Sequence, residues 1–277
     1  MDLLIDGLAF AESPRWRGDR LFISDFHAHR VIAVALDGRS ETVCGVPGQP
    51  SGLGWLPDGR LLVVSMTDRR ILRLEHDGRL VEHADLSRIA TFHCNDMVVD
   101  AKGAAYVGNF GYDILGGALP VPASLARVDP GGEVSVAATD LSFPNGAVIS
   151  EDGRHFVLAE SLAHRLTAFD ICPDGSLANR RTWAQLDFAP DGICLDAEGC
   201  IWVADPVGRQ VVRVSDRGGV ISRFGMEMPC IACALGGPDR TQLFIVCAPR
   251  IHPEKAAKLR SGRIYVVGVD VPGAGRP

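Results

Sequence analysis

A turn followed by a short β-strand pattern recurs six times along the chain, and this repeat constrains the fold more than any other sequence feature. The copies are GDRLFIS (18–24), PDGRLLVVS (57–65), AKGAAYVGN (101–109), EDGRHFVLA (151–159), AEGCIWVAD (197–205) and PDRTQLFIV (238–246). Equivalent turn residues are Asp19, Asp58, Lys102, Asp152, Glu198 and Asp239, at steps of 39, 44, 50, 46 and 41 residues. Six units in 277 residues average about 46 residues each.

Most units continue with a second strand pattern and another turn, as in RVIAVALDG (30–38) and QVVRVSDRGG (210–219). Two hairpins per unit make a four-stranded sheet, and repeated sheets of this length are typical of β-propellers. The sequence therefore predicts an all-β, six-bladed β-propeller with four-stranded blades around a central channel. No linker interrupts the repeat, so residues 1–277 are expected to form a single domain. The segment after Arg263 is expected to add a strand beside the N-terminal segment and close the ring, and residues 252–260 are the one predicted helix.

Charge and composition exclude several classes of partner. The chain has 28 Lys and Arg against 34 Asp and Glu, and the resulting net charge of −6 argues against nucleic acid. No apolar stretch approaches the ~20 residues of a membrane span, and the first ten residues do not resemble a signal peptide. We therefore expect a soluble cytoplasmic protein that binds neither nucleic acid nor membrane, with its eight cysteines reduced. The sequence leaves the oligomeric state open.

Oxygen-bearing side chains recur at one fixed offset from the repeated turn. Seven residues before each turn marker stand Glu12, Ser51, Asn95, Asn145, Asp191 and Ala232, each at the entrance of an innermost strand. In a propeller these positions surround one end of the channel. Two carboxylates and two amide carbonyls are hard oxygen donors, which suit one divalent cation, with Ca²⁺ favoured and Mg²⁺ or Mn²⁺ as alternatives. No His or Cys stands there, so Zn²⁺ is less favoured. Alternatively, each Asx side chain only caps its own turn.

The same stretches show that the chain resembles the senescence marker protein 30 / gluconolactonase / luciferin-regenerating-enzyme-like family. The similar segments are AESPRW (11–16), PSGLGWLPDGRLLV (50–63), CNDMVVDAKGAAYVGN (94–109), FPNGAVISEDG (143–153) and APDGICLDAEGCIWVA (189–204). The resemblance implies a six-bladed propeller whose channel holds a divalent cation. It also implies that Glu12, Asn145 and Asp191 are metal ligands, and that Asn95 lies beside the metal and contacts it or the substrate. Members of the family open lactones, mainly sugar lactones, and some relatives cleave phosphotriesters.

Two departures from the family pattern bear on the substrate. His93 stands where sugar-lactonase members carry an arginine, and the loop from Asn109 to Ala123 is apolar and rich in Gly and Pro instead of acidic. Both favour a substrate less polar than gluconolactone. We expect Asn95, His93, Asn109 and Tyr112 to contact it.

These observations predict a metal-dependent hydrolase that opens a small-molecule lactone or related ester. Asp191 is the predicted catalytic residue, as the base that accepts a proton from water. Its family role is also consistent with a nucleophile or with a ligand only. One alternative is a phosphotriesterase-like hydrolase on the same metal site. Another is a non-enzymatic binding propeller in which the cation only pins the blades.

Overall fold

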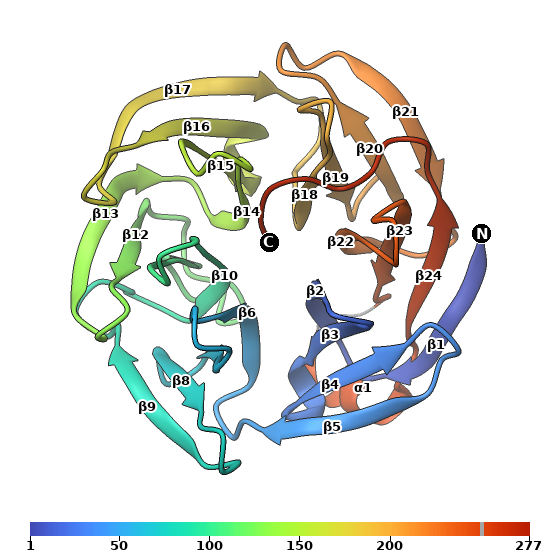
Figure 1. Ribbon diagram of the computed structural model, residues 1–277, viewed down its shortest axis with the longest axis horizontal. Coiled ribbons are helices and arrows are strands. Elements are labelled where there is room, and N and C mark those ends of the chain that lie inside the picture. Colours follow the sequence, from blue (N-terminus) through green and yellow to red (C-terminus); the bar gives the residue numbers. More distant parts are fainter. Residues whose placement is uncertain (250–251) are drawn as a thin grey trace.

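Six antiparallel four-stranded sheets surround a central axis in the computed structural model, which describes residues 1–249 and 252–277 (Figure 1). Each sheet is one blade. In blades 1 to 5 the strands follow sequence order, from β2-β3-β4-β5 to β18-β19-β20-β21, and blade 6 has the order β1-β24-β23-β22. The predicted six-bladed β-propeller is confirmed.

Each blade contributes one strand to each of four layers around the axis. The innermost strands are β2 (Ala11–Arg17), β6 (Pro50–Trp55), β10 (Cys94–Val99), β14 (Pro144–Ile149), β18 (Ile193–Leu195) and β22 (Cys230–Gly236). The second strands are β3 (Arg20–Asp25), β7 (Leu61–Ser65), β11 (Ala105–Asn109), β15 (His155–Glu160), β19 (Ile201–Asp205) and β23 (Gln242–Cys247). The third strands are β4 (Arg30–Ala35), β8 (Arg70–Leu74), β12 (Ala123–Val128), β16 (Arg165–Ile171), β20 (Gln210–Val214) and β24 (Gly262–Gly268). The outermost strands are β5 (Ser40–Gly45), β9 (Leu80–Asp85), β13 (Val134–Leu141), β17 (Leu177–Gln185), β21 (Val220–Gly225) and β1 (Asp2–Leu8).

The two ends of the chain close the ring by sharing blade 6. The N-terminal strand β1 pairs antiparallel with β24, with Asp2 opposite Val266 and Leu8 opposite Gly262. Figure 1 shows the blue N-terminal strand beside the red C-terminal strand. This pairing confirms the predicted closure.

The repeated turns are built by short aspartate-containing segments. In blade 2 the Asp58 carboxylate accepts the backbone N–H of Arg60 at 3.1 Å, and Asp152 accepts that of Arg154 at 3.0 Å in blade 4. Gly59, which lies between Asp58 and Arg60 in the blade 2 turn, has φ +91°, a left-handed conformation that favours glycine. The local chemistry of the Asp-Gly pair therefore explains why the repeat is visible in the sequence.

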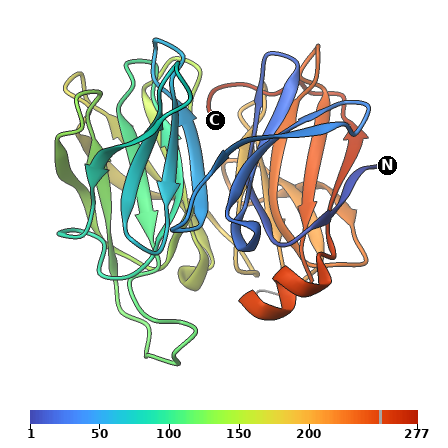
Figure 2. The same ribbon diagram turned by 90° about the horizontal axis from the view of Figure 1, so that it is seen from below.

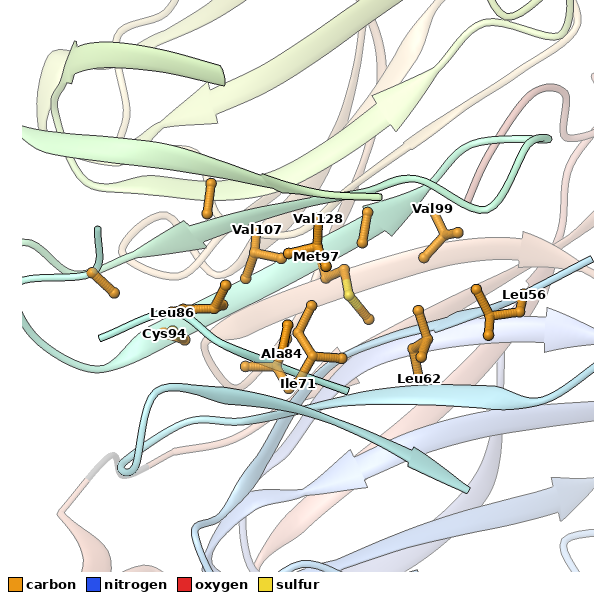
Figure 3. Close-up of a cluster of buried hydrophobic side chains, with 14 residues drawn as sticks. Leu56, Leu62, Ile71, Ala84, Leu86, Cys94, Met97, Val99, Val107 and Val128 are labelled. Atoms are coloured by element: carbon orange, nitrogen blue, oxygen red, sulfur yellow. The ribbon is translucent and has the colours of Figure 1, made fainter. Parts of the chain in front are cut away.

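Apolar side chains fill the space between neighbouring blades. Between blades 2 and 3, Leu62 and Ile71 pack against Met97, Val107 and Val128, all fully buried or nearly so (Figure 3). The innermost strands β10 and β14 are buried along their whole length, whereas the outermost strand β21 is largely exposed. Burial of apolar surface between sheets thus fixes the angle of one blade to the next.

The two ends of the propeller differ. The 3₁₀ turns η1 (Phe26–Ala28) and η2 (Ser161–Ala163), the helix α1 (Pro253–Leu259) and the long loop after β11 project from one end, whereas the C-terminal segment crosses the other (Figure 2). We call the first the loop end. The helix predicted over 252–260 is confirmed. No helix in the described ranges is long and apolar enough to cross a membrane, and the eight cysteines, all described, are free thiols.

Candidate active site

Four of the six predicted channel positions gather at the loop end. Glu12, Asn95 and Asn145 are each the second residue of an innermost strand, and Asp191 precedes β18 by two residues. A β-bulge follows each of the first three, where the register with the second strand shifts. Bulges re-aim side chains at the rims of β structures. All four side chains line one cavity of about 410 Å³.

The other two channel positions, Ser51 and Ala232, do not line this cavity. Ala232 packs in the apolar cluster between blades 6 and 1. Ser51 is buried, and within the described residues its hydroxyl oxygen has no hydrogen-bond partner. The oxygen donors at the cavity therefore come from blades 1, 3, 4 and 5.

Hydrogen bonds link both amide side chains to the neighbouring blade, directly for Asn95 and through Ser161 for Asn145. The Asn95 amide nitrogen donates to the carbonyl oxygen of Pro144 at 3.2 Å. The Asn145 amide nitrogen donates to Ser161 Oγ at 3.2 Å, and that hydroxyl donates to the Pro190 carbonyl at 2.6 Å. Because these contacts use the amide nitrogens, the carbonyl oxygens are the groups left for a cation.

Within the described residues, positive charge compensates the two carboxylates of the cavity only weakly. Neither Glu12 nor Asp191 forms an ion pair with a described Arg, Lys or His side chain, although both are half-buried. Burial, then the charges of Asp191 and Asp96, hold the pKa of Glu12 well above its ordinary value. Burial also raises the pKa of Asp191 to about 8, and a hydrogen bond from Asn145 opposes the shift. This is an environment in which negative charge is under-compensated.

A buried ion pair lies below the cavity and was not predicted from the sequence. Arg15 Nη2 contacts Asp96 Oδ1 at 2.6 Å, and the Ser13 hydroxyl donates to the same oxygen at 2.8 Å. Arg15 also donates to the carbonyl oxygens of Leu53 and Met97. The pair therefore ties blades 1, 2 and 3 together directly beneath Glu12.

The donor set fits a hard divalent cation. Two carboxylates and two amide oxygens face one cavity, and the uncompensated negative charge is what such a cation would neutralise. Among the described residues, no three His, Cys, Asp or Glu side chains lie in metal-binding geometry. The predicted ligand set contains only two such side chains, Glu12 and Asp191, because its other members are asparagines.

Aromatic side chains form the walls above the donors. Phe10, Phe26, Phe110 and Phe143 line the cavity, and Phe110 stacks on Phe143 with ring centroids 4.9 Å apart. This wall was not predicted from the sequence. The repeat holds a signal for it, because Phe10 and Phe143 both stand two residues before an oxygen donor, Glu12 and Asn145, just ahead of an innermost strand.

Two of the four predicted substrate contacts line the cavity and two lie outside it. Tyr112 and Asn95 line the cavity. His93 lies outside the lining, stacked on Phe92 with centroids 4.1 Å apart and 6.1 Å from the wall residue Phe110. Asn109 also lies outside it, because its amide donates to the Ser124 carbonyl and accepts the Gly111 N–H. The structure thus gives Asn109 a role in holding the loop, and His93 a place behind the wall.

The family model described as the SMP-30/Gluconolactonase/LRE-like region matches residues 10–249. The chain belongs to this family. The matched region contains all four oxygen donors, from Glu12 to Asp191.

Individual relatives and solved structures agree with this assignment. The chain is 29% identical to regucalcin of Danio rerio over 212 residues, covering 74% of this chain and 68% of the relative. It is 27% identical to pentonolactonase XacC of Haloferax volcanii over 253 residues, covering 86% and 81%. A regucalcin structure from Agrobacterium tumefaciens, described as a calcium-binding protein, superposes with a TM-score of 0.83 at 22% identity, over 100% and 96% of the chains. A gluconolactonase structure from Xanthomonas campestris gives 0.77 at 23%, over 98% and 88%. These likenesses confirm the fold.

Proposed function

We propose that this protein is a divalent-metal-dependent lactonase whose substrate is less polar than a sugar lactone. The observation that carries the proposal is the convergence of two carboxylates and two amide oxygens on one aromatic-walled cavity, whose lining within residues 1–249 and 252–277 contains no cationic side chain. Family membership supports lactone hydrolysis, since a pentonolactonase and a gluconolactonase are among the similar proteins.

Glu12, Asn145 and Asp191 would hold the cation, with Asn95 beside it. Ca²⁺ is the favoured ion because every donor is an oxygen, and a structural relative is described as calcium-binding. A bound divalent cation supplies Lewis-acid polarisation of the ester carbonyl and stabilises the charge that develops on its oxygen.

Asp191 is the residue we assign to proton transfer. Asp191 lines the cavity, and the Asn145 side chain hydrogen-bonds it. Ring opening adds water to the carbonyl carbon and breaks the ester C–O bond. The Asp191 carboxylate would take the proton from the attacking water and return it to the leaving alkoxide, which yields a hydroxy acid.

The cavity walls support a substrate with an apolar substituent. The ring faces of Phe10, Phe110 and Phe143 offer no hydrogen-bond donors for sugar hydroxyls. Around the mouth, the exposed side chains Leu162 and Val207 extend the apolar surface.

A hydrolysis screen tests the proposal. Sugar, alkyl-substituted and aromatic lactones are incubated with the protein and Ca²⁺, Mg²⁺, Mn²⁺ or Zn²⁺, beside a panel of phosphotriesters. We expect the highest kcat/KM for an apolar lactone and no turnover after chelation. A preference for glucono- or xylonolactone contradicts the substrate assignment, and faster turnover of phosphotriesters favours that alternative reaction. Absence of any turnover favours a binding propeller.

A further inference from the structure

A second cavity, of about 580 Å³, opens at the end of the propeller opposite the loop end. It is formed where the innermost strands of blades 1, 2 and 3 end and where the C-terminal segment 275–277 crosses the axis. Figure 2 shows the C-terminus at this end, with α1 at the other. The Arg15–Asp96 ion pair lies between the two cavities, because Arg15 lines the second and Asp96 lies beneath Glu12.

Four arginines of the described ranges line this second cavity, and one of them, Arg15, is paired with Asp96. Within the described residues, Arg17, Arg240 and Arg276 form no ion pair with a carboxylate, and their guanidinium groups form none of the hydrogen bonds found in the structure. The lining also contains two acidic residues, and neither forms an ion pair with these arginines. Glu151 is exposed, and Asp100 accepts the backbone N–H groups of Lys102 and Ala104 in its own turn.

Each arginine has a contact that positions its side chain or its backbone, although Arg17 and Arg276 are exposed. The Arg17 guanidinium lies 4.7 Å from the centre of the Trp55 ring. The backbone of Arg276 pairs with Ile149 through two hydrogen bonds of 2.8 Å. The Arg240 guanidinium packs against Gly273: a Cβ atom at that position would lie 3.4 Å from the Nε and Nη2 atoms of Arg240. Partial burial and the charge of Arg276 lower the pKa of Arg17, which places these two cations in each other's field.

We propose that this arginine cavity binds a small organic oxyanion with two or more negative charges, a phosphate monoester or a dicarboxylate. Guanidinium groups bind such oxyanions through paired, charge-assisted hydrogen bonds. A dianion would also relieve the repulsion between Arg17 and Arg276. The indole rings of Trp16 and Trp55 provide an apolar wall for the organic part. The proposed substrate site has the opposite charge, so the two cavities select different ligands.

Calorimetric titration and tryptophan fluorescence test the proposal on the full chain in buffer containing Ca²⁺. The probes are phenylphosphonate for the phosphate source and isophthalate for the dicarboxylate source, with benzyl alcohol as the uncharged control. We expect at least one dianion to bind and to change the emission of Trp16 and Trp55. The tighter of the two probes identifies the source.

Matched variants locate the binding. Arg17→Ala and Arg276→Ala are each expected to weaken dianion binding about tenfold, and Arg276→Glu to weaken it further. Arg223→Ala removes an exposed arginine from the outer strand β21, and Glu12→Gln changes the opposite cavity. Both should leave dianion binding unchanged. The proposal is overturned if neither dianion binds, if binding survives in the Arg17→Ala/Arg276→Ala double variant with an unchanged melting temperature, or if Glu12→Gln abolishes it.

Discussion

Asp191 and Asn145 occupy equivalent positions in neighbouring blades, yet their side chains differ in the one property that acid–base chemistry requires. Both line the cavity, and Asn145 hydrogen-bonds Asp191. An amide and a carboxylate of similar size both offer oxygen to a cation, but only the carboxylate takes up a proton near neutral pH. At the scale of the residue, substitutions can therefore separate the proposed metal-ligand role from the proposed proton-transfer role.

Asp191→Asn is expected to retain detectable metal and to lower turnover by about 10²–10⁴-fold, the usual cost of losing a general base. Asn145→Ala should act through metal occupancy, because it removes one neutral donor. Steady-state kinetics across a metal titration checks this: excess metal should partly rescue Asn145→Ala and should not rescue Asp191→Asn. Equal rescue of both variants would show that Asp191 is only a ligand.

The elements that hold the site were largely predictable from the repeat. The offset of seven residues led to Glu12, Asn95, Asn145 and Asp191 because hydrogen bonds within the repeated turn fix where each second strand begins. The positions of His93 and Asn109 were not predictable, because tertiary neighbours decide them. The Ser124 carbonyl engages the Asn109 amide, and Phe110 occupies the wall in front of His93.

The packing between blades provides a test at the scale of the element. Met97 is fully buried between blades 2 and 3 (Figure 3), so Met97→Ala should lower the free energy of unfolding by about 2–5 kcal/mol. Val136→Ala, on the exposed face of the outer strand β13, is the matched control and should change it by less than about 0.5 kcal/mol. Urea denaturation measures both. A loss for Met97→Ala no larger than that of the control would contradict the packing.

Blade 4 contains a buried carboxylate that links stability to pH. Glu160 accepts hydrogen bonds from Thr167, from Arg165 at 2.9 Å and from the Ser142 N–H at 2.8 Å. Burial alone would raise its pKa, but these hydrogen bonds outweigh burial and lower it.

Because the pKa of Glu160 is lower in the folded state, its contribution to stability is present above the pKa of the unfolded chain. It is lost as the pH falls through the folded-state value. Glu160→Gln should therefore cost about 1.5–3 kcal/mol at neutral pH and less in acid. Urea midpoints from neutral to acidic pH would measure this. If the loss of stability in Glu160→Gln stays constant as the solution is acidified, Glu160 does not link stability to pH.

At the scale of the whole molecule, the propeller axis separates two cavities of opposite character. Glu12 and Asp191 face the loop end, whereas Arg17 and Arg276 face the opposite end. The arginine cavity could not be predicted from the repeat, because Arg276 lies in the C-terminal segment and meets Arg17 only when the ring closes. Ring closure thus creates a site that no single blade contains.

The four oxygen donors come from four different blades, so metal binding should stabilise the whole ring and not one sheet. A ligand that binds only the folded state adds about 2.7 kcal/mol at a hundredfold excess over Kd, and for a chain of this size that corresponds to roughly 5–10 °C in Tm. We therefore expect chelation to lower the Tm by several degrees and Ca²⁺ to restore it. Glu12→Gln should shrink the shift because it removes a ligand charge, whereas Ser51→Ala, at the equivalent position outside the cavity, should preserve it. If none of Ca²⁺, Mg²⁺, Mn²⁺ and Zn²⁺ moves the melting curve of the chelated protein, the four side chains do not form a metal site, and their convergence must be explained by turn capping alone.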